Sequence, residues 1–338
     1  MSFDLLKLFA MYLVIWGHCI MWLLSSESSD NMVFRILNAF HVSLFMMISG
    51  YFAVSSIKLP PIKFFNKKFR QLIYPCFVWG LLILLFVYYL LYRNSSCLDD
   101  INGFSIKQLL VDLYWYSDFW FLKSCFICYC LLYLGSHLGL KTIYWILLTL
   151  LVSQFISPFF VSFMYPSFIL GYVMKEFQSY RLFIKQKALL ILSIFIFMLF
   201  FWDKAAWENS HGISLEVFYS GFPNILSVAF SRLYRLVLGI FGALSFFSLA
   251  MYIPNERMQS KFLCRVVYWG GYTLEIYILQ SVILEKTISH YFKFDDMNIQ
   301  LFNYFVSPLI AVVILLACII IVRLLLKSNS LMTILFGR

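Results

Sequence analysis

Residues 306–322 read VSPLIAVVILLACIIIV, and residues 81–91 read LLILLFVYYLL. Several apolar runs of this kind reach the roughly 20 residues that a helix needs to cross about 30 Å of hydrocarbon. Lipid offers the backbone no hydrogen-bond partner, so the runs are expected to be helical. A barrel strand would instead alternate apolar and polar residues over about 10 positions. The sequence therefore predicts an all-α integral membrane protein.

The composition agrees with this prediction. The chain is 62% hydrophobic and 12% charged, with a mean hydropathy of +0.86, whereas a soluble domain is about 25% charged. The net charge of +10 comes from basic residues in loops between the apolar runs. That placement is typical of membrane topology, so we expect no nucleic-acid partner. The first run carries Lys7 and His18 and lacks a cleavage site, which argues against a removable signal peptide.

We predict about ten crossings within a single transmembrane domain spanning residues 1–338. The expected spans are 5–24, 38–55, 72–92, 119–134, 142–157, 159–174, 185–202, 232–252, 266–284 and 301–327. Loops after the even-numbered spans are basic, and the alternate loops, including 93–118 and 203–216, are acidic. Since Lys and Arg favour the cytoplasm, both termini are predicted to be cytoplasmic.

One apolar segment, residues 213–231, does not fit this count. It contains Gly221, Pro223 and Asn224, and a crossing there would place the basic residues of the following loop outside. We therefore predict a re-entrant or interfacial helix on the outer face.

Ionisable residues inside spans indicate function by default. Lys7 and His18 are 11 positions apart, so on a helix they differ by only about 20° in direction and lie about 16 Å apart along the axis. One face of the first span would thus carry a cation near the cytoplasm and an imidazole toward the outside. The alternative is a snorkelling Lys7 with a structural His18.

Other polar groups give weaker signals. His41 is expected near the depth of His18, as a site residue or as an interfacial histidine. Lys123 and Glu275 are expected either to pair with each other or to take part in catalysis. Arg232 and Arg235 share a helix face, where they either snorkel or bind an anion. The chain has eight cysteines, and Cys97 alone falls in a long polar loop. Cys125 and Cys128 are interpreted as packing residues, and no metal site is predicted.

Five segments in order resemble the acyltransferase-3 family of bacterial membrane O-acyltransferases. They are Phe3–His18, Phe40–Phe52, Lys67–Pro75, Phe119–Leu122 and Tyr272–Gln280. The first contains the family's basic residue, ten residues, then histidine, matched here by Lys7 and His18. Two positions depart from the family pattern: Gln280 stands where many members have histidine, and Glu275 where many have glycine. These departures argue against a catalytic role for the last segment.

The resemblance implies a multi-pass enzyme of the bacterial inner membrane. It would move an acyl group, most often acetyl, from cytoplasmic acetyl-CoA to a hydroxyl of an extracytoplasmic or lipid-linked surface-polysaccharide sugar. No permanently bound cofactor is expected, and the oligomeric state stays open.

We predict roles for the site residues on this basis. His18 would be the general base or a transient acyl carrier, and His41 would orient it or the sugar. Donor phosphates would be bound by cations at the inner face, namely Lys7, Lys67, Lys68 and Arg70. The acceptor would be bound by Arg232, Arg235 and Trp120.

Two other classes of function stay open. A transporter or flippase of lipid-linked sugars would also be polytopic, but such proteins usually show related halves with paired broken helices. The sequence shows one broken segment and no second copy. A non-catalytic subunit of an envelope complex would not need Lys7 and His18 on one face.

Overall fold

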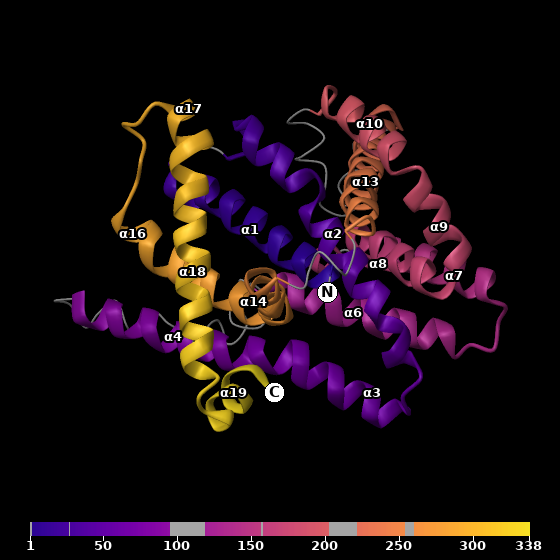
Figure 1. Cartoon of the computed structure of the whole chain (residues 1–338), viewed down its shortest axis with the longest axis horizontal. Helices are drawn as coiled ribbons and strands as arrows, with labels where there is room; N and C mark the ends of the chain where they lie inside the picture. Colours follow the sequence, from indigo (N-terminus) through magenta and orange to yellow (C-terminus); the bar gives the residue numbers. More distant parts are fainter. Residues whose placement is uncertain (1, 27, 95–118, 157, 203–221, 254–259) are drawn as a thin grey trace.

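The computed structural model describes residues 2–26, 28–94, 119–156, 158–202, 222–253 and 260–338 (Figure 1). Within these residues all regular secondary structure is helical, as predicted. Cys97, most of both long acidic loops and residues 213–221 of the predicted re-entrant segment lie outside the described part of the chain.

Except across residues 95–119, the helices of the first half of the chain are joined by short connections. They are α1 (Ser2–Leu23), α2 (Met32–Ile57), α3 (Pro61–Lys68), α4 (Tyr74–Asn94), α6 (Trp120–Ser136), α7 (Thr142–Gln154) and α8 (Val161–Glu176). Two 3₁₀ turns, η1 (Ser28–Asp30) and η4 (Pro158–Phe160), and one π-helix, η2 (Phe69–Ile73), connect them.

The second half contains the longest described helix, at residues 222–250, together with several short and irregular ones. The α-helices are α9 (Gln178–Gln186), α10 (Ala188–Leu199), α13 (Phe222–Ala250), α14 (Lys261–Trp269), α15 (Thr273–Gln280), α16 (Ser289–Tyr291), α17 (Ile299–Leu301), α18 (Ser307–Leu325) and α19 (Asn329–Phe336). The 3₁₀ turn η6 (Gly270–Tyr272) and the π-helices η7 (Ser281–Ile288) and η8 (Phe302–Val306) lie between them.

Each predicted span coincides with at least part of a helix, but not every such helix is a full crossing. Among the described residues five helices are long and apolar enough to cross a membrane, or six if the bent pair α9 and α10, which meet at 68°, forms one span. The five are Phe3–Leu23, Met32–Ile57, Pro61–Phe86, Leu226–Ala250 and Ile299–Leu325. The membrane character of the fold is thereby supported, and the number ten stays a prediction.

The segment predicted to be re-entrant differs from expectation where the structure describes it. Residues 222–231 form the first part of α13, which runs without a break from Phe222 to Ala250. Pro223 is the second residue of this helix, and proline is tolerated in a first turn because the backbone N–H there has no intrahelical acceptor. Within the described residues, 222–231 and the predicted span 232–252 therefore belong to one helix rather than to two.

The centre of the molecule is the crossing of α2 and α8. A Cβ at Gly50 would overlap the carbonyl of Phe168, and a Cβ at Gly171 would overlap the carbonyl of Met47. Two glycines facing opposite backbones let the helices approach closely, as small residues do in membrane helix pairs. This contact fixes α2, which carries His41.

Polar contacts join the predicted outer end of α1 to the last third of the chain. The Trp16 indole Nε1 donates to Ser307 Oγ at 2.9 Å. The backbone N–H of Phe294 donates to the carbonyl of Leu23 at 3.0 Å, and Lys293 Nζ donates to the Trp22 carbonyl at 2.8 Å. These contacts place residues 293–294 over the end of α1 nearest His18.

The opposite end is formed by α3, η2, η6 and α19. Gly270 lies so close to α1 that a Cβ there would overlap the carbonyl of Asp4. α19 folds back beneath α18 and packs on α4 (Figure 1). The N-terminal turn of α1 and the C-terminal helix therefore lie at the same end of the molecule.

Candidate active site

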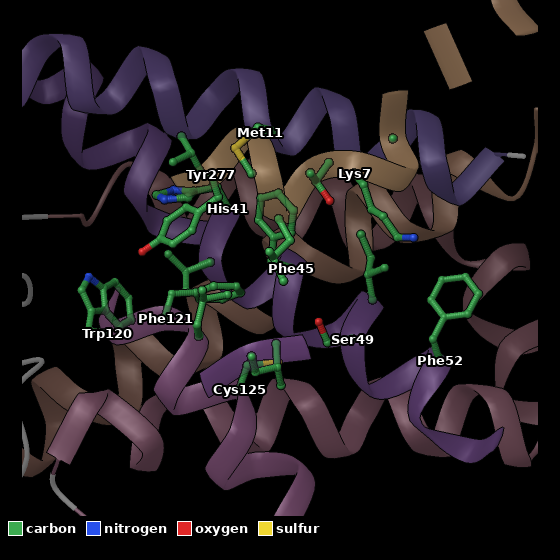
Figure 2. A pocket seen from close by; sticks show the side chains of 18 of the residues that line it. Lys7, Met11, His41, Phe45, Ser49, Phe52, Trp120, Phe121, Cys125 and Tyr277 are labelled. Carbon is green, nitrogen blue, oxygen red and sulfur yellow. The ribbon is translucent and has the colours of Figure 1, made fainter. Parts of the chain in front are cut away.

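A cavity of about 260 Å³, here called the central cavity, lies between α1, α2, α6 and residues 270–277. It is lined by Lys7, Met11, Val14, His18, His41, Val42, Phe45, Ile48, Ser49, Phe52, Leu72, Trp120, Phe121, Leu122, Cys125, Tyr129, Gly270, Gly271, Thr273, Leu274 and Tyr277. Figure 2 shows Lys7 and Phe52 at one end and His41, Tyr277 and Trp120 at the other. The predicted stripe of α1 thus faces a cavity, as its spacing requires.

His18 is held by two side chains from the segment after α15. Its Nδ1 lies 2.9 Å from Glu285 Oε1 and 3.2 Å from Gln280 Oε1. A carboxylate only accepts hydrogen bonds, so Nδ1 carries the proton and donates it. The unprotonated Nε2 of the neutral ring is then available as a base. A carboxylate that fixes the tautomer in this way leaves the other ring nitrogen free to act as a general base and stabilises the imidazolium that forms.

Glu285 is itself fixed and desolvated. Its side chain is 8% exposed, and its Oε2 accepts from Ser281 Oγ at 2.9 Å. Ser289 Oγ donates to the Glu285 backbone carbonyl at 2.6 Å. A buried carboxylate needs such partners, and here they also hold it against His18.

The π-helix η7 explains how Gln280 and Glu285 reach the same nitrogen. On an α-helix, residues five apart differ by about 140° in direction. A π-helix bonds residue i to i+5, so side chains five apart come to nearly the same face. Glu285 is not among the residues predicted for the site, and the departures at Gln280 and Glu275 argued against a catalytic role for residues 272–280, whereas the structure places both Gln280 and Glu285 against His18.

His41 has its own fixed orientation. Its Nδ1 lies 2.6 Å from the carbonyl of Leu37, to which it donates, and its side chain is 3% exposed. Nε2 is again the nitrogen without the proton. His41 lies close enough to His18 and Arg235 for their charges to interact. His18 and His41 therefore line one cavity, and in the neutral form of each ring Nε2 is a hydrogen-bond acceptor.

Lys7 marks the other end of the central cavity. Its Nζ lies 3.0 Å from Asp4 Oδ1 and 4.7 Å from the centre of the Phe52 ring. Both Lys7 and Asp4 are partly exposed. The aromatic ring and the carboxylate hold the ammonium at the mouth of the cavity.

A second, smaller cavity of about 150 Å³, here called the neck, continues the first. The two share Ser49, Leu72, Cys125, Tyr129 and Leu274. Lys68 lines the neck, is only 6% exposed, and lies 3.6 Å from the centre of the Tyr129 ring. In the described part of the chain no carboxylate pairs with Lys68, so its charge is directed at this cavity.

A third cavity of about 410 Å³, the entrance pocket, opens beyond the neck. It is lined by Lys63, Asn66, Lys67, Arg70, Gln71, Gly337 and Arg338, and shares Gln71 and Arg338 with the neck. Four of its lining residues are cations, and none is acidic. The predicted donor-binding residues Lys67 and Arg70 thus lie at one end of a series of cavities and His18 at the other.

The predicted acceptor-binding residues are divided. Trp120 lines the central cavity at the end of His41 and stacks edge-on against Phe160, with ring centres 5.0 Å apart. Arg232 donates to Ser162 Oγ at 3.3 Å. Arg235 is 7% exposed and lies 5.0 Å from the centre of the Phe163 ring. Neither arginine lines the three cavities.

The predicted pair of Lys123 and Glu275 is wrong. Glu275 is fully buried and lies 2.9 Å from Arg338 Nε, whereas Lys123 lies 5.1 Å from the centre of the Phe159 ring, in a separate apolar cavity. Glu275 comes from the first turn of α15 at the end of the molecule where α19 lies. Because Arg338 is far from Glu275 in the sequence, the spacing of residues around Glu275 gave no indication of this pairing.

The cysteines of the C-x-x-C pattern are both buried and free. Cys125 lines the central cavity and the neck, and Cys128 does not. Across the described ranges no group of three or more His, Cys, Asp or Glu side chains is placed to hold a metal ion.

A family model described as an acyltransferase domain matches residues 2–326 of this chain. The match covers every helix from α1 to α18 and ends before α19. Comparisons with curated proteins and with solved structures gave no match.

Proposed function

This chain belongs to the acyltransferase-3 family, and on that premise we propose that it is a membrane O-acetyltransferase. The donor is acetyl-CoA, and the acceptor is a hydroxyl of an extracytoplasmic or lipid-linked surface-polysaccharide sugar. The proposed reaction needs no permanently bound cofactor. The family supports acyl transfer at a membrane, and the lining of the cavities supports a donor that carries phosphates at one end and an uncharged arm at the other.

One observation carries the proposal: the entrance pocket, which Arg70 lines, shares residues with the neck, and the neck shares residues with the central cavity, which His18 lines. CoA has phosphates at one end and its thioester at the other. Cations at the open end suit the phosphates, and the largely apolar central cavity suits an uncharged acyl arm. The thioester would then lie near His18.

The chemistry follows from the orientation of His18. Its Nε2 accepts the proton of the sugar hydroxyl as the hydroxyl oxygen attacks the thioester carbonyl carbon. The new C–O bond forms, the C–S bond breaks, and the CoA thiolate takes up a proton as it leaves. Glu285 stabilises the imidazolium formed in between. In a second route Nε2 forms a C–N bond to the acetyl carbon as the C–S bond breaks and the CoA thiolate leaves. The sugar hydroxyl then attacks that carbon, the C–N bond breaks, and the hydroxyl proton passes to Nε2.

We place the entrance pocket on the cytoplasmic side because it gathers basic residues of the loop that the charge distribution assigns to the cytoplasm. His18 then lies toward the outside, where Trp120, Arg232 and Arg235 would bind the acceptor. The complete proposal is a single domain of about ten crossings in a bacterial inner membrane, with both termini in the cytoplasm.

The test is an NMR spectrum of the surface polysaccharide from a deletion strain. We expect the O-acetyl signal to disappear, to return with the wild-type gene, and to stay absent with His18→Ala at normal protein levels. Polysaccharide that reaches the surface in normal amount with unchanged acetylation would contradict the proposal. Loss of the polysaccharide itself from the surface would instead indicate a transporter of its lipid-linked precursor.

A further inference from the structure

The C-terminal helix follows the part of the chain that the family model matches. α19 is held by Phe336, which is 1% exposed and lies 5.6 Å from Trp79 between ring centres. Gly337 ends the helix with φ +68°, a conformation that favours glycine. A Cβ on Gly337 would overlap the carbonyl of Arg70. The segment therefore sets Arg338 at a fixed place beside η2.

Three contacts hold the Arg338 side chain. Its Nε lies 2.9 Å from Glu275 Oε1, its Nη2 donates to the Gly271 carbonyl at 2.8 Å, and its guanidinium carbon lies 4.9 Å from the centre of the Tyr272 ring. Glu275 is 0% exposed, and a buried carboxylate is costly unless a cation compensates it. In the described ranges Arg338 is the one cation in an ion pair with Glu275. The pair thus fixes the guanidinium.

This arrangement leaves part of the guanidinium available. The group has five N–H donors in a rigid plane, and the contacts to Glu275 and Gly271 involve Nε and Nη2. The side chain is 44% exposed and lines both the entrance pocket and the neck. Arg338 therefore shares the entrance pocket with Lys67 and the neck with Lys68.

We propose that Arg338 binds the nucleotide phosphates of the CoA donor and that Glu275 positions it. The proposal rests on the proposed function and adds a residue outside the matched family range. A guanidinium held by a buried carboxylate is pre-organised, so little side-chain freedom is lost when phosphate oxygens accept its remaining N–H groups. The lysines of the entrance pocket attract the phosphates by charge alone, whereas Arg338 also fixes their orientation through paired hydrogen bonds.

The test is calorimetric titration of CoA into the purified full chain in lipid nanodiscs. Arg338→Gln alone would leave the Glu275 carboxylate buried and unpaired, so the decisive comparison is between Glu275→Gln and Glu275→Gln/Arg338→Gln. Neither variant contains that carboxylate, and they differ only in the guanidinium. We expect CoA to bind roughly 10- to 100-fold more weakly to the double variant.

The control ligand is S-acetylpantetheine, which carries no phosphate and should bind both variants equally. Lys327→Gln, which removes an exposed cation just before α19 and outside the three cavities, should bind CoA like the wild type. Equal CoA affinity of the two Glu275 variants overturns the assignment, as does equal weakening for S-acetylpantetheine. If the wild type binds no CoA, CoA is not the donor and the proposed function is contradicted. If the wild type binds CoA but the two Glu275 variants bind it equally, only the role of Arg338 is contradicted.

Discussion

The two ends of the cavity series use charge in opposite ways. At the histidine end, His18 and Glu285 are mutually paired and His41 is bonded to a backbone carbonyl. At the entrance, Lys67 and Arg70 are exposed on a surface whose lining residues include no acid. The histidine end has a few groups whose orientation is fixed by hydrogen bonds, and the entrance has several side chains that all carry positive charge.

This difference separates two kinds of contribution to a reaction. Fixed, desolvated groups act on bonds that change in the transition state, so their loss lowers kcat. Exposed cations attract the donor equally in its ground state and transition state, so their loss raises KM. The proposed function therefore predicts that substitutions at the two ends have separable kinetic effects.

The largest effect is expected for His18→Ala. Removing a general base typically lowers the rate by about 10²- to 10⁴-fold, and here the CoA affinity should stay unchanged because the phosphates bind elsewhere. The measurement is transfer of labelled acetyl to the isolated glycan, together with CoA titration. His290→Ala removes an exposed histidine outside the central cavity and serves as the control. Unchanged turnover in His18→Ala would remove the distinction between the two ends.

A smaller loss, on the order of 10²-fold in kcat, is expected for Glu285→Gln. The amide keeps the size of the side chain but no longer stabilises the imidazolium. KM for acetyl-CoA should not move. Glu176→Gln, at the exposed C-terminal end of α8, is the matched control. A KM effect as large as the kcat effect would show that Glu285 acts on the structure of the cavity rather than on His18.

At the entrance we expect about a tenfold increase in KM for acetyl-CoA with Lys67→Gln/Arg70→Gln, at nearly constant kcat. Since these charges are exposed, added salt should weaken donor use by the wild type more than by the variant. Steady-state kinetics at two salt concentrations measures both effects. Lys187→Gln, an exposed cation between α9 and α10, should behave like the wild type. A decrease in kcat without an increase in KM would contradict the assignment of the entrance cations to donor binding.

The smallest effect concerns the loop over the histidine end. Asp295 accepts from the Ser25 backbone N–H at 2.7 Å and from Ser25 Oγ at 2.6 Å, and these bonds hold the pKa of its carboxyl below the usual 3.8. A depressed pKa stabilises the folded state above the unfolded value, and the stabilisation is lost as the pH falls below it.

Asp295→Asn should therefore be less heat-stable than the wild type at neutral pH, and the difference should shrink below about pH 4. Thermal unfolding across this range tests the sign. At neutral pH the acetylation rate should stay within about twofold, because the loop contributes no group to the central cavity. A stability difference that grows on acidification would contradict the assigned bonds.

The sequence predicted those parts of the site that follow α-helical spacing. Lys7 and His18 share a face because 11 residues are nearly three turns, and both line the central cavity. Lys67 and Arg70 share the entrance pocket for a similar reason, being three positions apart. Apolar runs also located the helices, since hydropathy depends only on local composition.

The rest depends on backbone irregularity and on distant contacts. Glu285 reaches His18 through the π-helix η7, which the α-helical period does not anticipate. Arg338 pairs with Glu275 across the fold, and no local pattern favoured it over Lys123. The number of crossings was inferred from run length and loop charge, whereas the structure breaks the segment 261–288 into four pieces.

The middle of the central cavity is lined by apolar side chains. Met11 and Val14 lie between Lys7 and His18 on α1, and Phe45 and Ile48 lie between His41 and Phe52 on α2. A hydrophobic constriction sheds water, and without a chain of water molecules ions do not pass. On the proposed function, an uncharged acetyl thioester would enter such a largely apolar passage more readily than a proton or a sodium ion would. On the proposed function, the acetyl group would therefore cross the bilayer without an accompanying leak of protons.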